Sequence, residues 1–403
     1  MKKLVQLLLL VLFITQLVSC RSNWSHQVDP DTAVLVNQAL TKAGDNAPEL
    51  RQALDQAPKE QKKGVAFLIA YMPEQDLKIL SADFILKNTK WAYQARETFP
   101  WCKKLPEEIF MNEVLPYASL LEHRDLWRPE FYARFEPYVR DCKDIYAAID
   151  SVNRNIQKEL GVVYNTKRSR VDISPFQAIK EQMATCTGLS FLLVDAFRSV
   201  GIPARFAGTA MWTNMRGNHS WVEVWIDGKW YFTEYYPDAL NKSWFVADAG
   251  KADPADPLHW IYAVTYKPGN CHFPMSWAKN DSTIHARNVT DRYIRIYQQQ
   301  LKGNELNPDE LLVKVVLYEN GGDTGQSDNR LHRKLVVQLR GKQVDFGYTP
   351  SPTDDLNRYL IFKLKKNTNY TFSTVGETGQ FEKSWAIITG KKNEQMVRLN
   401  MDK

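Results

Sequence analysis

The sequence contains few cysteines and, after its first 20 residues, no long hydrophobic run. Five of the 403 residues are cysteine, too few for a fold that depends on a disulfide framework. Beyond Cys20, no segment approaches the roughly 20 consecutive apolar residues of a membrane-spanning helix. The chain is therefore expected to form about two or three globular domains after one short hydrophobic segment.

Charge of one sign is not concentrated in any part of the sequence. The net charge is +6, without a long basic run or the alternation of aromatic and basic residues typical of binding to a phosphate backbone. Nucleic acid is therefore not an expected partner. The sequence also lacks a glycine-rich phosphate loop and a calcium loop, and its scattered histidines lack the paired spacing of a structural zinc site. We expect no metal and no obligatory cofactor.

The first 20 residues have the parts of an export signal: basic residues at Lys2 and Lys3, an apolar stretch, and the small residue Ser19 before Cys20. Because Leu17 stands three residues before Cys20, the segment resembles a bacterial lipoprotein signal, which is cleaved in front of a lipidated cysteine. An uncleaved membrane helix is the alternative, but about fifteen apolar residues are too few for it. Residues 1–20 are therefore the expected lipoprotein signal, with cleavage before Cys20, which becomes the mature N-terminus. A lipid on Cys20 would then anchor the protein to the membrane of the bacterial cell envelope, at the outer membrane or a periplasmic face.

The hydrophobic pattern changes twice along the rest of the chain. Residues 21–160 repeat apolar residues three and four positions apart, which indicates helices, and frequent prolines require these helices to be short or to begin at proline. Residues 161–288 combine one buried helix, 184–200, with a strand and a hairpin. Residues 289–403 are expected to form only strands, about six or seven, as in a small β-sandwich. The predicted fold class is α+β.

Four cysteines remain after the one assigned to lipid. Cys102 and Cys142 both lie in the helical region and could form a disulfide; the alternative is that they are free buried thiols, and Cys271 is left unpaired in either case. Cys186 stands at the first turn of the buried helix, where free backbone N–H groups and the helix dipole favour a thiolate. It is the candidate nucleophile, and its own N–H could stabilise an oxyanion. A small buried residue that merely begins a helix is the alternative for Cys186.

A hairpin places a histidine and a carboxylate side by side. Asp227-Gly228 between two segments rich in aromatic and β-branched residues is a strong signal for a two-residue turn. With this turn, the numbers of facing residues sum to 455, so His219 and Glu234 are diagonal neighbours on one face. A carboxylate there fixes the imidazole tautomer and leaves the other nitrogen for a thiol. Asp238 is the alternative acid, disfavoured because the proline before it should end the strand.

These motifs together resemble the core of the transglutaminase-like superfamily. The motifs are Thr185-Cys-Thr-Gly188, Gly201-Ile-Pro-Ala-Arg205, Asn218-His-Ser-Trp-Val-Glu-Val-Trp225 and Gly228-Lys-Trp-Tyr231. The resemblance covers about residues 165–245 and implies a papain-like core. It also implies Cys186 as nucleophile, His219 as base and a carboxylate, usually aspartate, at the position of Glu234. Gln182 is the candidate second donor of an oxyanion hole, with Gln177 as the alternative.

The resemblance implies a reaction through a thioester, which water or an amine then resolves. We expect a cysteine hydrolase, a protease or amidase, that cleaves amide bonds of peptide, protein or glycopeptide substrates, with acyl transfer as the other outcome. Glutamate in place of aspartate leaves a second interpretation open. In that interpretation the protein is a catalytically impaired lipoprotein that binds or scaffolds a glycan or an envelope protein.

Overall fold

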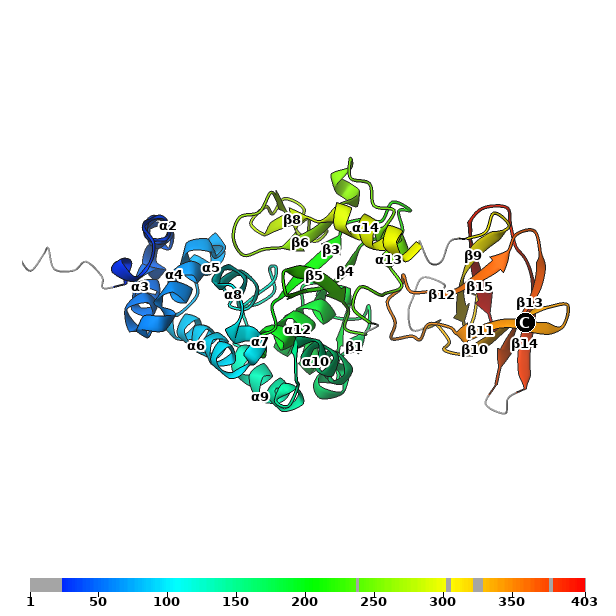
Figure 1. The fold of residues 1–403 in the computed structure, drawn as a ribbon, viewed down its shortest axis with the longest axis horizontal. Coiled ribbons are helices and arrows are strands. Elements are labelled where there is room, and N and C mark those ends of the chain that lie inside the picture. The colour runs from blue at the N-terminus through cyan, green and yellow to red at the C-terminus, as the bar shows by residue number, and fades with distance from the viewer. Residues whose placement is uncertain (1–23, 237–238, 302–305, 322–328, 377–379, 403) are drawn as a thin grey trace, which may run out of the picture.

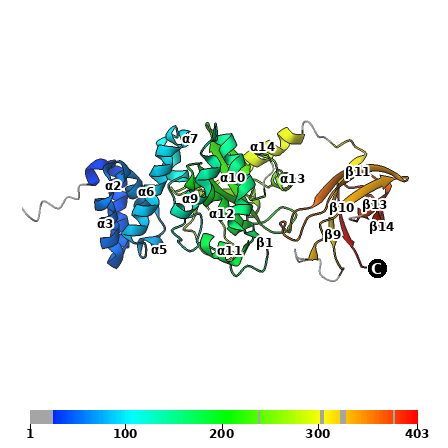
Figure 2. The ribbon, with the colours of Figure 1, turned by 90° about the horizontal axis from the view of Figure 1, so that it is seen from below.

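The computed structural model describes residues 24–236, 239–301, 306–321, 329–376 and 380–402. Cys20, the predicted lipidation site, and Asp238, the alternative acid, lie outside the described residues. The chain forms an elongated molecule with helices at one end, a mixed core in the middle and β-sheets at the other end (Figure 1). The same order is visible after a quarter turn (Figure 2). The predicted α+β class is confirmed.

Short helices that begin near prolines build the N-terminal region, as the sequence predicts. The helices are α2 (Pro30–Lys42), α3 (Ala47–Gln56), α4 (Lys62–Tyr71), α5 (Glu74–Leu77), α6 (Ala82–Thr98), α7 (Pro100–Lys103), α8 (Glu107–Glu113), α9 (Arg128–Val139) and α10 (Ile145–Leu160). Pro48 and Pro129 stand in the first turns of α3 and α9, and Pro73 and Pro106 directly precede α5 and α8. A proline at a helix start costs no helical hydrogen bond. Pro137 is the exception, because it lies inside α9.

A six-stranded sheet and a buried helix form the core. The strands are β3 (Ala204–Thr209), β4 (His219–Ile226), β5 (Lys229–Thr233), β6 (Ile261–Val264), β7 (Cys271–His272) and β8 (His285–Asn288). They are arranged in the order β5-β4-β3-β6-β8-β7. The helices are α11 (Pro175–Glu181), α12 (Cys186–Ser199) and α13 (Val246–Ala249), and a short parallel pair joins β1 (Val163–Tyr164) to β2 (Met183–Ala184).

Helix α12 is the buried helix of the sequence prediction. It begins after Thr185, whose backbone is extended, and every residue from Thr187 to Ser199 is buried. Gly201 follows with φ +72°, a left-handed conformation that glycine adopts without strain and that commonly ends a helix. The helix therefore begins and ends where the sequence places it, with Cys186 in its first turn.

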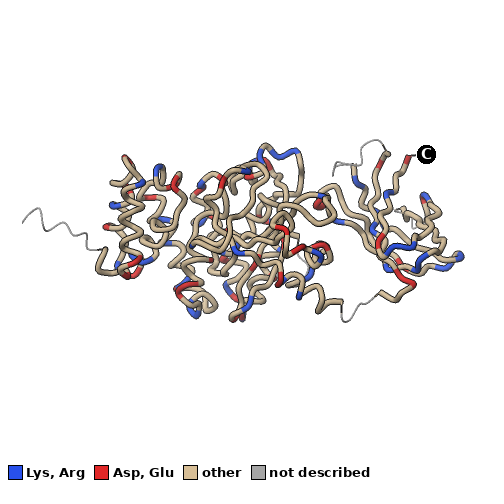
Figure 3. The backbone as a smooth tube through the Cα atoms, turned by 90° about the horizontal axis from the view of Figure 1, so that it is seen from above, with Lys and Arg blue, Asp and Glu red and all other residues tan. Residues whose placement is uncertain are grey.

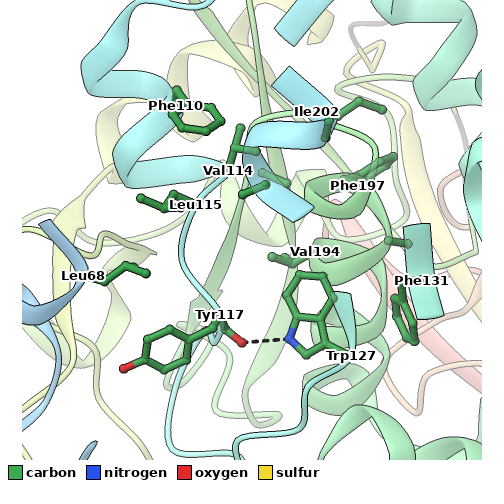
Figure 4. Packing of buried hydrophobic residues seen from close by; sticks show 14 of the residues in the cluster. Leu68, Phe110, Val114, Leu115, Tyr117, Trp127, Phe131, Val194, Phe197 and Ile202 are labelled. Atoms are coloured by element: carbon green, nitrogen blue, oxygen red, sulfur yellow. Dashed lines mark hydrogen bonds between the residues drawn. The ribbon is translucent and has the colours of Figure 1, made fainter. Parts of the chain in front are cut away.

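Aromatic side chains hold α12 against the N-terminal helices. Phe197 and Val194 on α12 face Trp127 and Phe131 in the core (Figure 4), and the Trp127 indole donates a hydrogen bond to the carbonyl of Tyr117 at 2.8 Å. Burial of side chains of this size contributes roughly 1.5–3 kcal/mol each. The helical region is thus a scaffold for α12 and, through it, for Cys186.

The hairpin follows the predicted register. All five residue pairs of β4 and β5 have numbers that sum to 455. Asp227 and Gly228 have φ of 46° and 86°, as a type I′ turn requires. The ladder ends at Thr233, and His219 pairs with Thr209 of β3. The arithmetic therefore holds from the turn to the pair Val222–Thr233, next to Glu234.

The C-terminal part is a two-sheet sandwich with its own apolar core. Its strands are β9 (Glu310–Tyr318), β10 (Lys334–Leu339), β11 (Lys342–Tyr348), β12 (Leu360–Lys365), β13 (Asn369–Val375), β14 (Phe381–Ile388) and β15 (Glu394–Asn400). One sheet has the order β11-β10-β13-β14 and the other β12-β9-β15. These seven strands of the described residues agree with the six or seven that the sequence predicts. Val315, Val337 and Phe372 are among the buried residues between the sheets.

The prediction that only strands follow residue 289 is wrong over α14 (Thr290–Leu301). Tyr293, Ile296 and Tyr297 have helical spacing, but aromatic and β-branched residues also favour strands. Tyr293 is buried in the same cluster as Trp221, and this contact attaches α14 to the core sheet. The helix therefore belongs with the core by its packing, and the sandwich strands begin at β9.

The suggested disulfide between Cys102 and Cys142 is not formed, because all described cysteines are free. Cys102 is buried beside Gly201, and the Cys142 thiol donates a hydrogen bond to the carbonyl of Tyr138 at 3.6 Å. Each thiol therefore has its own local packing, and apolar contacts hold the helical region together.

Two properties of the whole molecule bear on its surroundings. None of the described helices is long and apolar enough to cross a membrane. Figure 3 shows Lys and Arg interspersed with Asp and Glu along the helices, the core and the sandwich. Charges of both signs therefore share the described surface.

We predict that Gly201→Ala destabilises the core more than Gly161→Ala. Both glycines have positive φ, 72° and 68°, so each alanine costs about 1 kcal/mol in conformation. A methyl group at Gly201 would lie 2.7 Å from Cβ of Cys102, whereas at Gly161 the nearest atom would be 3.6 Å away. Urea unfolding should show an additional loss of about 1–3 kcal/mol for Gly201→Ala. Equal losses for the two variants would contradict this close packing behind α12.

Candidate active site

His219 lies at the start of β4 and is 2% exposed. Its Nε2 is 2.9 Å from Oε1 of Glu234, the carboxylate that the hairpin arithmetic selects. Ser243 donates a hydrogen bond to the other oxygen of Glu234 and so fixes the orientation of the carboxylate. Four aromatic rings lie around the imidazole: Trp212, Trp221, Trp244 and Phe245.

Cys186 is the first residue of α12, and its side chain is half-buried. Its sulfur, a ring nitrogen of His219 and a carboxylate oxygen of Asp355 all lie within 4.8 Å of one another. Thr185, at the N-cap, makes no side-chain hydrogen bond to the helix, so the free N–H groups of the first turn lie beside the sulfur. These groups and the helix dipole favour negative charge there.

Asp355 is a residue of this site that the sequence analysis missed. It lies in the segment between β11 and β12, and its Oδ2 is 3.4 Å from Nδ1 of His219. The backbone N–H of Asn357 donates to Oδ1 of Asp355 at 2.8 Å, and Arg330 donates to the Asp355 carbonyl at 2.7 Å. No motif marks this turn segment, so nothing in the sequence relates it to His219.

The charges in the site reinforce one another. Burial lowers the pKa of His219, but the carboxylate of Asp355 and the interactions with Cys186 and Glu234 raise it well above its usual value. Burial raises the pKa of Asp355, but the facing His219 outweighs burial and leaves this pKa below its usual value. The site therefore stabilises an imidazolium beside carboxylates, the charge state that a thiolate partner needs.

The other described cysteines lie in less favourable surroundings. Burial raises the pKa of Cys102 to about 12. Burial, and then nearby aspartates, raise the pKa of Cys142, and burial raises that of Cys271. Since the thiolate is the nucleophilic form, a raised pKa makes each of these three thiols a weaker candidate for the nucleophile than Cys186.

A cavity of about 30 Å³ lies in front of the thiol. Besides Cys186, His219, Glu234 and Asp355, its walls contain Tyr164, Leu189, Ser190, Ser220, Tyr235 and Tyr236. Burial raises the pKa of the Tyr164 phenol, and the charges of Asp355 and Cys186 raise it further, so this group keeps its proton. Tyr164 is therefore an O–H donor at the cavity, a second residue that the sequence analysis missed.

The structure does not bring Gln182 to this cavity. Gln182 ends α11 in a left-handed conformation, its side chain is exposed, and its amide nitrogen is directed toward Gly161. Gln177, the alternative, donates hydrogen bonds to Ser169 at 2.8 Å and to Glu181 at 3.0 Å. The assignment of Gln182 to an oxyanion hole therefore has no support from the geometry, because the turn after α11 directs the amide away from the thiol.

Comparisons relate the chain to known proteins. Residues 133–235, which include Cys186, His219 and Glu234, match the transglutaminase-like superfamily. Among solved structures, the chain is similar to a candidate cysteine protease from Cytophaga hutchinsonii, with 21% identity and a TM-score of 0.28 over 37% of this chain and 48% of that chain. It is also similar to red sea bream transglutaminase, with 9% identity and a TM-score of 0.33 over 72% of this chain and 65% of that chain. The chain thus spans less than two thirds of either structure. A search of the curated proteins finds no match.

The core is of the α+β class, and the thiol at the start of its buried helix faces an imidazole on an antiparallel sheet. This arrangement defines the class of proteins with a papain-like cysteine-histidine pair. Within this class, residues 133–235 match the model of the transglutaminase-like superfamily. The family named in the sequence analysis is confirmed, and the segment begins earlier than expected, within α9.

We predict that Glu234→Gln slows alkylation of Cys186 by iodoacetamide at neutral pH by about tenfold or more. The amide can still contact Nε2, but it removes a charge-assisted hydrogen bond to the imidazolium, a loss of about 1.5–3 kcal/mol. Mass spectrometry of the peptide that contains Cys186 measures the rate. Glu181→Gln, the same change at a half-buried residue of α11, serves as the control. An unchanged rate in Glu234→Gln would show that Glu234 does not support the thiol-imidazole pair.

Proposed function

We propose that this protein is a cysteine hydrolase that cleaves amide bonds through a thioester on Cys186. The observation that carries the proposal is the position of His219, whose ring touches the Glu234 carboxylate on one side and lies near the Cys186 sulfur on the other. A base must be within reach of its nucleophile, and an orienting group must hold the base. Cys186, His219 and Glu234 meet both requirements.

The reaction follows from the roles that the positions allow. The His219 nitrogen opposite Glu234 takes the thiol proton, and the Cys186 sulfur attacks the carbonyl carbon of an amide. The Cys186 backbone N–H and the Tyr164 hydroxyl, both from residues that line the cavity, would be the donors to the oxyanion. His219 then gives the proton to the departing amine, which leaves the acyl group on sulfur. A water molecule that loses a proton to His219 hydrolyses this thioester and restores the thiol.

The size and lining of the site support peptide or glycopeptide amides as the proposed substrates. A carbonyl carbon must come within about 3–3.5 Å of the sulfur, whereas a cavity of about 30 Å³ holds little more than a water molecule. Substrate entry therefore requires the segment that carries Asp355 to move. The tyrosines of the wall, Tyr164, Tyr235 and Tyr236, offer flat surfaces with polar tips that suit peptides or glycopeptides. Hydrolysis is the proposed outcome, and acyl transfer to an amine is the alternative.

A binding or scaffold role is the second candidate, and the position of Asp355 favours it. A carboxylate 3.4 Å from the imidazole occupies the approach that a substrate needs. If the segment between β11 and β12 does not move away from His219, no substrate reaches the Cys186 thiol. The β-sandwich and the N-terminal helices would then bind an envelope protein or a glycan.

For the enzymatic proposal, Cys186→Ala should abolish turnover while the fold remains, because the change removes one sulfur atom from a helix start. The assay is hydrolysis of a panel of peptide and glycopeptide amides, followed by mass spectrometry. The intact wild-type protein should also gain the mass of an acyl group, and added hydroxylamine should release it as a hydroxamate. Hydrolysis at the wild-type rate in Cys186→Ala would contradict the proposal.

We also propose that a lipid on Cys20 holds the protein on the bacterial cell envelope, where its substrates would be found. Expressed with its first 20 residues in a bacterium, the wild-type chain should sediment with membranes and incorporate labelled fatty acid. Cys20→Ser should lose the label and leave the membrane fraction, since no other lipid site is expected. Retention of the label in Cys20→Ser would contradict lipidation at this residue.

A further inference from the structure

Three side chains from distant parts of the chain converge on one point with donor atoms for a metal ion. The Cys186 sulfur comes from the start of α12, a His219 nitrogen from β4, and an Asp355 oxygen from the segment between β11 and β12. These atoms lie within 4.8 Å of one another, and they are the only such group of three or more among the described residues. His219 is 2% exposed and Asp355 is 9% exposed, so two of the three donors are held in the interior.

The proposed hydrolysis leaves Asp355 unexplained. Glu234 already orients His219 through Nε2 at 2.9 Å, so a second carboxylate is not needed for that purpose. Asp355 instead faces Nδ1, and this buried nitrogen has no hydrogen-bond partner among the described residues. A buried nitrogen that faces a carboxylate and lies near a thiol, without a well-formed hydrogen bond to either, is suited to bind a cation between them.

The donor set points to zinc among the common metals. Thiolate, imidazole and carboxylate are its usual ligands, at about 2.0–2.3 Å, and a site with three protein ligands leaves the fourth position to water. Ligand atoms around a tetrahedral ion of this kind lie about 3.5 Å apart. Because no pair of the three atoms is more than 4.8 Å apart, the side chains need to close by little more than about 1 Å. The cavity of about 30 Å³ beside them has room for a water molecule at the fourth position.

Groups behind the donors orient them as in zinc proteins. The Glu234 carboxylate at Nε2 favours the tautomer with its proton on Nε2, which leaves the Nδ1 lone pair free for a metal. Ser243 fixes Glu234, and the backbone N–H of Asn357 holds Oδ1 of Asp355 at 2.8 Å. Arg330, which is buried, donates hydrogen bonds to the carbonyls of Asp355 and Leu356 and attaches the segment to the sandwich.

We propose that Cys186, His219 and Asp355 form a zinc-binding site. Zinc bound there keeps the Cys186 thiol inactive as a nucleophile for as long as the β-sandwich holds Asp355 beside His219. When zinc(II) binds, the Cys186 thiol and the His219 imidazolium each release a proton to solvent. The sulfur and Nδ1 then each donate an electron pair to the ion, whose oxidation state does not change. The inhibitory consequence rests on the proposed function, but the binding of zinc does not. The ion is not needed for hydrolysis, in agreement with the expectation of no obligatory cofactor.

Zinc binding to the metal-free full chain, measured by isothermal titration calorimetry, tests the site. The wild type should bind one zinc ion per chain, and Asp355→Asn and Cys186→Ala should each weaken binding at least tenfold. Asp354→Asn is the matched control, because Asp354 is the neighbouring acid but pairs with Arg358 at 2.8 Å, and it should bind as the wild type does. Cobalt(II) should give a thiolate-to-metal charge-transfer band in the wild type and none in Cys186→Ala. Equal zinc affinity in wild type, Asp355→Asn and Cys186→Ala would overturn the proposal.

The rate of Cys186 alkylation separates this inference from the proposed function. In metal-free buffer, a reactive Cys186 supports the enzyme, and zinc should protect it in the wild type but not in Asp355→Asn. A reactive Cys186 that zinc neither binds nor protects would overturn the metal site and leave the enzyme intact. Tight zinc binding with an inert thiol in metal-free buffer would support the site and refute the enzyme. Circular dichroism of each variant checks that the fold is retained.

Discussion

The site depends on one buried imidazole that is held from both sides. Glu234 fixes Nε2 of His219 at 2.9 Å, while Asp355 and the Cys186 sulfur lie around the rest of the ring. A histidine that is 2% exposed bears charge only if carboxylates compensate for lost hydration. The hairpin, the start of α12 and the segment before β12 must therefore meet at this ring, and the rest of the structure supports that convergence.

A second buried charge network supports the sheet behind His219. Glu223 on β4 pairs with Arg205 on β3 at 2.8 Å, contacts Arg292 of α14, and accepts a hydrogen bond from Tyr293 at 2.6 Å. The Tyr293 hydroxyl also accepts a hydrogen bond from Trp221, which lies next to His219 in the ring cluster. Loss of one partner in such a network would leave a buried charge unpaired, at a large cost in stability. The network therefore fixes α14 to the sheet and, with it, the orientation of β4.

Local sequence patterns predicted those parts of the site that lie within one short stretch of chain. The turn at Asp227-Gly228 fixes the register, and the register relates His219 to Glu234 by counting alone. Gly201 and the apolar face before it define α12 and place Cys186 at its start. Asp355 could not be found in this way, because its approach to His219 depends on how the sandwich packs against the core. Gln182 is not among the residues that line the cavity; it ends α11 with a left-handed φ of 56° and has its amide nitrogen near Gly161, and nothing in the sequence signals that turn.

The reactivity of the four described thiols, compared in one sample of the metal-free wild-type protein, tests the central claim most directly. Iodoacetamide at neutral pH, followed by mass spectrometry, gives the alkylation rate of Cys186 beside those of Cys142 and Cys271, which are also half-buried. Our account predicts that Cys186 reacts at least about tenfold faster than these two and faster than free cysteine, because the helix start and His219 stabilise its thiolate. A Cys186 that reacts no faster than Cys142 would contradict the account and leave a protein whose cysteine-histidine pair has no chemical function.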